Sequence, residues 1–154
     1  MFVGRIGWTL SRVARCSLVV KNLPRVSLYF RFYGDSFDPD EITRRLGIQP
    51  THSFLPGDPI TEDGRGRRRG YGWWIKVGPE STLDIEDMLH ELRERVDVSP
   101  EIVRQVCSDL NVDLVVVCGV GRNEADTMPT MFFPSNFLSW IVELDASLNV
   151  DVIL

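Results

Sequence analysis

The sequence predicts an α+β protein: a ferredoxin-like βαββαβ sandwich preceded by an extra strand and a short helix, with a mostly antiparallel sheet and helices packed on one face. Three observations support this prediction. The 154 residues suit one domain. Hydrophobic residues make up 44% and charged residues 25%, as in ordinary globular proteins. Finally, segments of period-two hydrophobicity alternate with segments of helical periodicity.

The extra strand and helix come first in the body of the chain. Apolar Leu28, Phe30 and Phe32 alternate with Tyr29, Arg31 and Tyr33, which predicts a strand over 27–33 with one buried face. Asp38 suits an N-cap, Pro39 the first helical position, Glu41 a capping box and Gly47 a left-handed stop. A short helix is therefore predicted between them.

A long loop then leads into the sandwich. The segment Gln49 to Tyr71 is rich in Pro, Gly and Arg and has no sustained periodicity, which predicts a long, partly extended loop. The alternation at 73–77 predicts the second strand. The remaining predictions are a helix over 85–96 with a capping box at Ser81 and Asp84, a helix starting at Ser99-Pro100, a central strand over 112–120, a strand over 128–133, a helix capped by Ser135, and a closing strand over 150–153.

The first 25 residues differ from the rest in charge. Residues 1–34 hold six basic and no acidic side chains, so 35–154 has 11 basic against 22 acidic residues and a net charge of −11. We expect 1–25 to be a disordered extension or a mis-assigned start, and 26–154 to be the domain; a targeting peptide or a packed functional arm are the alternatives. The run Leu18 to Val20 is too short to span a bilayer.

Charge and cysteine content narrow the partners and the compartment. A body at −11 is a poor match for nucleic acid and favours a basic protein partner. Cys16, Cys107 and Cys118 form no CxxC pair, which disfavours disulfides and structural zinc and favours the cytoplasm. Cys107 and Cys118 lie in apolar segments, where cysteine behaves as a small hydrophobic residue.

No motif nominates catalytic residues, a metal site or a cofactor. Helix capping explains the acidic residues at 35–41, and His52 and His90 lack supporting ligand spacing. The Gly119-Val120-Gly121 run lacks the third glycine of a dinucleotide fingerprint and is interpreted as a turn after a strand. We therefore predict a protein that is not an enzyme.

The loop carries the one stretch typical of a binding site. Arginines at 65–69 precede Tyr71, Trp73 and Trp74, and arginine forks bind phosphates while aromatic rings stack on bases. The alternative is a solvated loop neutralised by Asp58, Glu62 or Asp63. Trp74 is also interpreted as a buried core anchor. The candidate ligand- or partner-binding residues are Thr51, Gly57, Asp58, Arg67, Arg68, Arg69 and Trp74.

Several segments together resemble a bacterial family, domain of unknown function 4279. The resemblance lies in Leu28 to Asp35, Phe37 to Thr43, Leu46 to Thr51, Gly57 to Ile60, Tyr71 with Trp74, Ser81 to Ile85 and Asn149 to Val152. It covers about 26–154 and implies a small cytosolic bacterial protein without an assigned activity. No catalytic residue can be carried over from it.

The functional hypothesis is therefore a non-enzymatic binding or protein-interaction module. One concrete form is an immunity-type protein that masks a basic toxin. The alternative is an enzyme or small-anion-binding protein that uses the Gln49 to Tyr71 loop.

Overall fold

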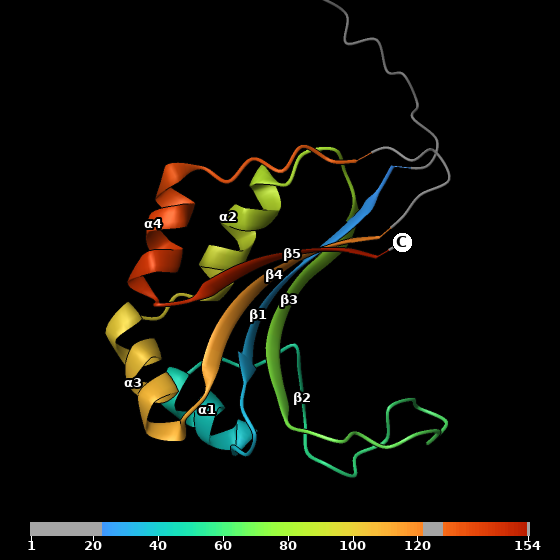
Figure 1. The fold of residues 1–154 in the computed structure, drawn as a ribbon, viewed down its shortest axis with the longest axis vertical. Coiled ribbons are helices and arrows are strands. Elements are labelled where there is room, and N and C mark those ends of the chain that lie inside the picture. Colours follow the sequence, from blue (N-terminus) through green and yellow to red (C-terminus); the bar gives the residue numbers. More distant parts are fainter. Residues whose placement is uncertain (1–22, 122–127, 154) are drawn as a thin grey trace, which may run out of the picture.

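Five strands and four helices make up residues 23–121 and 128–153, the part of the chain that the computed structural model describes. The four helices lie on one side of the sheet, and the other side carries no helix within these ranges (Figure 1). The elements are β1 (Arg25–Tyr33), α1 (Pro39–Leu46), β2 (His52–Phe54), β3 (Gly72–Ser81), α2 (Glu86–Arg95), α3 (Pro100–Leu110), β4 (Asp113–Gly121), α4 (Ser135–Glu143) and β5 (Ser147–Ile153).

The sheet has the strand order β2-β3-β1-β4-β5, so the first strand of the chain lies at its centre. Three of the four junctions are antiparallel and the β4–β5 junction is parallel. The prediction of an α+β fold with a mostly antiparallel sheet and helices on one face is confirmed.

The ferredoxin-like element order is not confirmed, because 128–133 does not form the expected strand. In this segment Thr130 makes one isolated bridge to Asp84. Pro129 and Pro134 have no backbone N–H, so the segment cannot donate regularly to a neighbouring strand. Its apolar side chains Met131 and Phe133 pack against the core instead. From β3 onward the order is therefore strand, two helices, strand, helix, strand.

The core lies between the sheet and the helices. Val26, Leu28, Phe30 and Phe32 of β1 all point into it and are fully buried, as the period-two alternation predicts. Trp73 of β3 packs edge-on against both phenylalanine rings.

The buried indole of Trp73 also ties α1 to the sheet. Its Nε1–H donates to Thr43 Oγ1 over 2.9 Å, and the Thr43 hydroxyl donates to the Pro39 carbonyl over 3.1 Å. The polar atom of this large core residue is thus satisfied.

The observed N-terminal caps agree with the predicted ones in two helices and differ from them in two. Asp38 caps α1 and Ser99 caps α3, each followed by proline, as predicted. The predicted cap at Ser81 is wrong: Ser81 ends β3, and Asp84 Oδ1 accepts from the Glu86 N–H at the start of α2. Ser135 is the first residue of α4 rather than its cap.

The predictions for the leader fall mostly on residues 1–22, outside the described residues. Pro24 is buried, and its carbonyl accepts from the Thr82 N–H, so the described chain is packed from just before β1. Among the described helices, none has the length and apolarity needed to cross a membrane.

Candidate binding surface on the open face of the sheet

We call the side of the sheet opposite the helices the open face. The strand registers place one residue from each strand in a single row across it. Each residue of the row lies opposite the next across a strand pair, and neighbouring side chains in such a row are within contact distance. The row consists of His52, Trp74, Arg31, Val115 and Ser147.

An aromatic–arginine cluster occupies the part of this face formed by β1, β2 and β3, with one residue from the chain that leads into β3. The Arg31 guanidinium carbon lies 4.2 Å from the Tyr33 ring centre and 5.2 Å from that of Trp74. The Arg68 guanidinium lies 4.3 Å from the Phe54 ring centre. The Trp74 ring is 5.0 Å from His52 and 5.4 Å from Phe54. The cluster comprises Arg31, Tyr33, His52, Phe54, Arg68 and Trp74.

The two arginines of the cluster have no acidic partner among the residues that the structure describes. Within residues 23–121 and 128–153, no carboxylate oxygen lies within 4.0 Å of the Arg31 or Arg68 guanidinium. The Nε atom of each is buried without a hydrogen-bond partner in the same ranges. Stacking on rings, rather than ion pairing, therefore holds these two cations in place.

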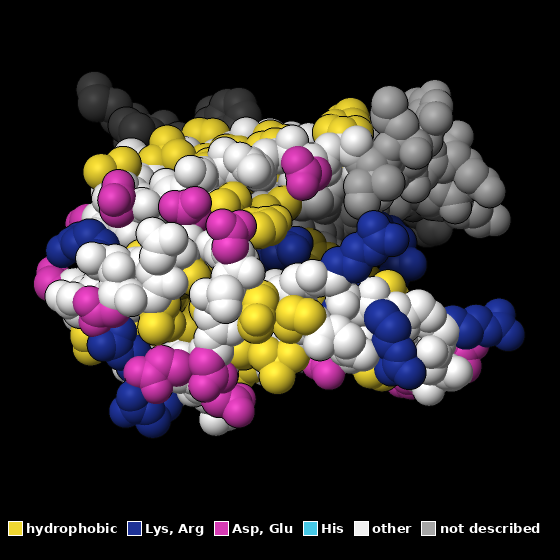
Figure 2. All heavy atoms as spheres, turned by 60° about the horizontal axis from the view of Figure 1, so that its bottom comes forward, with side chains coloured by type: hydrophobic (Ala, Val, Ile, Leu, Met, Phe, Trp, Pro, Cys, Tyr) yellow, Lys and Arg dark blue, Asp and Glu magenta, His cyan; other side chains and the backbone are white. Residues whose placement is uncertain are grey.

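Most arginines of the helices are paired with carboxylates. Arg45 Nη2 lies 2.6 Å from Asp109 Oδ2 and joins α1 to α3, and Arg95 Nη2 lies 2.6 Å from Glu91 Oε1 within α2. Figure 2 shows many of the visible acidic side chains on the left, whereas the projection on the right, formed by residues 55–70, carries arginines together with a few acidic side chains. The acidic body predicted from the sequence thus has a face of different character.

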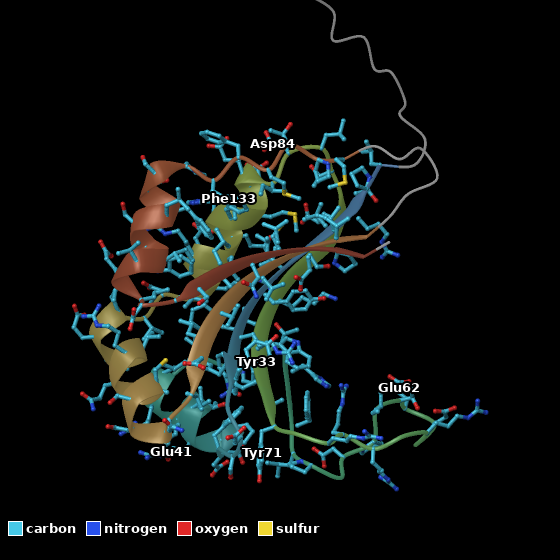
Figure 3. The ribbon with its side chains drawn as sticks, viewed as in Figure 1. Tyr33, Glu41, Glu62, Tyr71, Asp84 and Phe133 are labelled. Atoms are coloured by element: carbon cyan, nitrogen blue, oxygen red, sulfur yellow. The ribbon has the colours of Figure 1, made fainter. Side chains whose placement is uncertain are left out.

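The segment predicted as a long loop is more ordered than expected. Its start forms β2, and residues 55–70 form a hairpin that projects away from the helices, with Glu62 near its far end (Figure 3). Backbone bonds link Gly57 N–H to the Arg68 carbonyl, Arg68 N–H to the Asp58 carbonyl and Ile60 N–H to the Gly66 carbonyl. The hairpin was not predicted because the two segments that form it lack alternating apolar residues.

Three of the predicted site residues have structural roles in this region. Thr51 Oγ1 accepts from the Lys76 N–H over 2.9 Å, which continues the β2–β3 pairing. Gly57 has a φ of +94°, which favours glycine at the turn into the hairpin. Asp58 Oδ2 accepts from the Leu55 N–H over 2.7 Å. These residues shape the hairpin that lies beside the cluster.

The predicted arginines separate into two kinds. Arg68 belongs to the cluster, whereas Arg67 and Arg69 are exposed, and Arg67 donates to the Gly57 carbonyl. The predicted neutralisation of this run is found at Arg65, whose Nε lies 3.0 Å from Asp63 Oδ2.

The interpretation of Trp74 as a core anchor is wrong. Trp73 is the fully buried tryptophan, and Trp74 points to the open face and is half-buried. Successive strand residues point to opposite faces, so only one of the two can enter the core. Arg31, Tyr33, His52 and Phe54 were not predicted as site residues. The signal for Arg31 and Tyr33 was the polar half of the alternation at 27–33.

A hollow, which we call the end hollow, lies where β1 ends and β4 begins. Its volume is about 730 Å³, and its lining includes Asp35, Asp113 and Asp145 together with Cys107 and Arg104. The C-terminal residues of α3 and α4 also line it, and helix C-termini carry partial negative charge. This hollow is acidic, in contrast to the aromatic–arginine cluster.

The described cysteines are unreactive in character. Burial, followed by the nearby charges of Asp113 and Asp145, raises the pKa of Cys107 to about 11. Burial also raises the pKa of Cys118 to about 11. Both are thiols at neutral pH, in agreement with the prediction that they behave as small hydrophobic residues. In the part of the chain that the structure describes, no three His, Cys, Asp or Glu side chains gather to hold a metal ion.

Comparison with known families identifies most of this chain. Residues 24–154 match the family described as Domain of unknown function (DUF4279). The chain belongs to this family. The match begins one residue before β1 and includes all nine elements, so the DUF4279 domain contains both the open face and the end hollow. Neither a curated protein nor a solved structure matches the chain.

Proposed function

We propose that this protein is a non-enzymatic binding module whose open face receives an anionic group of a ligand or partner. The observation that carries the proposal is the state of Arg31 and Arg68. Both cations are stacked on aromatic rings, and neither has a carboxylate partner among the described residues. Guanidinium groups in this state keep hydrogen-bond donors for a carboxylate or phosphate from outside.

The rings around the two arginines favour binding in a second way. Contact of a guanidinium with an aromatic face contributes about 0.5–1 kcal/mol at exposed sites and more where water is excluded. Tyr33, Trp74 and Phe54 therefore limit the orientations of the two cations before any ligand arrives. Less conformational freedom remains to be lost on binding.

The chemistry of the cluster supports binding rather than catalysis. It combines rings and permanent cations, which recognise charge and shape. Cys107, the thiol nearest to a large hollow, has a pKa of about 11 and is a weak nucleophile at neutral pH.

A basic partner, which the net charge favours, would bind elsewhere on the domain. The end hollow supplies the three carboxylates of Asp35, Asp113 and Asp145. An immunity-type complex with a basic toxin would therefore use the end hollow, so the two forms of the binding role can be separated by mutation.

The experiment compares captured ligands across variants. The full chain is immobilised and exposed to cell extract, and bound proteins and small molecules are identified and purified for affinity measurement. The test variant is Arg31→Gln with Trp74→Ala. The matched control is Arg44→Gln, because Arg44 is exposed and paired with Glu41 on α1.

We expect the test variant to lose affinity by about tenfold or more, the effect of removing a hydrogen bond to a charged group, while the control binds like the parent. Equal binding of every captured molecule by parent and test variant would overturn the proposal. Loss on Asp113→Asn with Asp145→Asn instead would assign the interaction to the end hollow and a basic partner.

A further inference from the structure

A smaller hollow lies on the open face along β1 and shares Arg31 and Tyr33 with the aromatic–arginine cluster. Its volume is about 290 Å³, near the lower limit for small-molecule sites, so it suits one small molecule. Alternate residues of β1 form one side, the end of β4 forms the floor, and β5 contributes Asp151. We call it the β1 hollow.

The floor of the β1 hollow is low because its strands carry small side chains there. Ser27 of β1 lies opposite Gly119 of β4, and Gly119 lies opposite Asp151 of β5. Gly119 has no positive φ, and a Cβ atom added there would meet its nearest neighbours at 3.7 and 3.8 Å, which is ordinary contact. Neither backbone conformation nor close packing requires glycine at 119, so its effect is to leave the floor open.

The walls supply chemistry for a planar ring. Tyr29 and Arg25 lie two residues to either side of Ser27 on the same face of β1, so a ring placed over Gly119 would lie between them. Both a phenol ring and a guanidinium plane stack on heteroaromatic rings. This part of the lining is suited to a flat group rather than to an alkyl chain.

Charged groups of both signs line the β1 hollow: Arg25 and Arg31 of β1, and Asp151 of β5. Arg31, which has no carboxylate partner among the described residues, lines the part of the hollow next to Tyr33. Asp151 lies two rows away, opposite Gly119. An ionised carboxylate only accepts hydrogen bonds, so it recognises N–H groups, whereas arginine recognises an oxyanion.

We propose that the β1 hollow binds one nucleoside monophosphate, with the base over Gly119, N–H groups of the base donating hydrogen bonds to the Asp151 carboxylate, and the phosphate at Arg31. The inference rests on the proposed binding role of the open face and specifies a ligand class for it. Guanine presents two adjacent N–H donors on one edge, so guanosine monophosphate is the preferred ligand. The same chemistry could come from a free nucleotide or from the end of a single strand.

The test is a titration of the full chain with each ligand, in which the chemical shifts of the backbone amides report binding. The ligands are guanosine monophosphate, adenosine monophosphate, guanosine, inorganic phosphate and a short guanine-containing single strand. We expect guanosine monophosphate to shift amides of β1, β4 and β5. Guanosine and phosphate should each bind about tenfold more weakly or worse, because each lacks one charge-assisted contact. Tighter binding of the strand than of the nucleotide would identify a nucleic-acid end as the source.

Two variants and a control test the location. Gly119→Val fills the floor with a residue that favours strands, so the fold is retained. Asp151→Asn removes the carboxylate. Asn149→Val is the control, because Asn149 lies on the open face of β5 but outside the hollow. We expect the first two variants to lose most of the nucleotide affinity and the control to keep it.

The outcomes separate this inference from the proposed function. If no nucleotide shifts these amides, or if Gly119→Val binds like the parent, the nucleotide assignment is overturned, while ligands that depend on Trp74 would still support the binding role. If nucleotide affinity falls in Gly119→Val and Asp151→Asn but not in Asn149→Val, the nucleotide assignment stands, whichever molecules the immobilised chain captures from cell extract.

Discussion

Two consecutive tryptophans show how differently the two faces of the sheet are built. Trp73 is buried among Phe30, Phe32 and α1, and its indole N–H is bonded to Thr43. Trp74 is half-buried on the open face, where its neighbours are Arg31, His52 and Phe54. One residue of translation along β3 thus separates a side chain that stabilises the fold from one available to a ligand.

The arginines differ in the same way between the two regions. Four of the five helix arginines pair with carboxylates, as Arg45 does with Asp109; the fifth, Arg93, lies over the Trp140 ring. On the open face Arg31 and Arg68 stack on rings. An ion pair neutralises a cation, whereas a ring leaves it able to bind an anion. The contrast teaches that the residues likeliest to stabilise this fold and those suited to binding are distinguished by their partners, not by residue type.

The largest expected effect is that of Trp73→Ala. Removing a fully buried indole should lower the free energy of unfolding by about 3–5 kcal/mol, because a cavity forms beside Phe30 and Phe32. Denaturant unfolding followed by circular dichroism measures it. Trp73→Phe should lose less, since most of the ring volume remains; an equal loss in both variants would point to the Thr43 bond instead.

Trp74→Ala should have a smaller effect on stability. Its half-buried ring should account for about 1–2 kcal/mol of the free energy of unfolding, less than a fully buried aromatic residue. The same denaturant experiment, run beside Trp73→Ala, gives the comparison directly. A loss as large as that of Trp73→Ala would show that the two faces do not differ in the way described.

Arg68→Ser should be slightly destabilising, by about 0.5–1 kcal/mol, because it removes the contact of the guanidinium with Phe54. Arg69→Ser is the matched control: Arg69 is exposed, and surface substitutions usually change stability by less than about 0.5 kcal/mol. Thermal unfolding of the two variants measures the difference. Identical melting temperatures would mean that stacking contributes nothing at this position.

The smallest effect concerns pH and the ion pair between α1 and α3. Hydrogen bonds from Arg45 and then Gln105 lower the pKa of Asp109. A lowered pKa in the folded state means that the ionised group stabilises the fold at neutral pH, and that this contribution is lost as pH falls through the folded-state pKa. Asp109→Asn should therefore be less stable than the parent at pH 7, and the difference should disappear in strong acid.

Unfolding midpoints of the two proteins at several pH values test this expectation. Asp87→Asn on α2 is a suitable control, because Asp87 is exposed and takes part in none of the ion pairs between described residues. A parent and Asp109 variant that remain equally separated down to acid pH would contradict the ion-pair explanation.

The sequence predicted the elements with strong periodicity and missed those shaped by tertiary contacts. The alternation in β1 and β3 and the caps of α1 and α3 are local signals, and the structure confirms them. The segment 128–133 has an apolar composition typical of a strand, but Pro129 within it, Pro134 after it and its packing on the core prevent regular pairing. Whether such a segment pairs with a neighbouring strand depends on tertiary contacts, so its expected place in a βαββαβ order could not be tested from composition alone.

The candidate site was predicted only in part for a related reason. Arg68 and Trp74 were recognised because they lie in or beside a conspicuous run of arginines. Arg31 and Tyr33 lie far away in the sequence, and only the pairing of β1 with β3 brings Arg31 beside Trp74. The sequence indicated a loop as the candidate site; the site proposed from the structure is a sheet face, to which that loop contributes Arg68 through its contact with Phe54.

The central position of β1 also affects how the chain can fold during synthesis. β1 is the first of the described strands to leave the ribosome, yet both of its neighbours, β3 and β4, are made later. Until then the apolar side chains at Val26, Leu28, Phe30 and Phe32 have no sheet to complete, and exposed strands of this kind are prone to aggregate. The nascent chain therefore depends on its later half to protect its first strand.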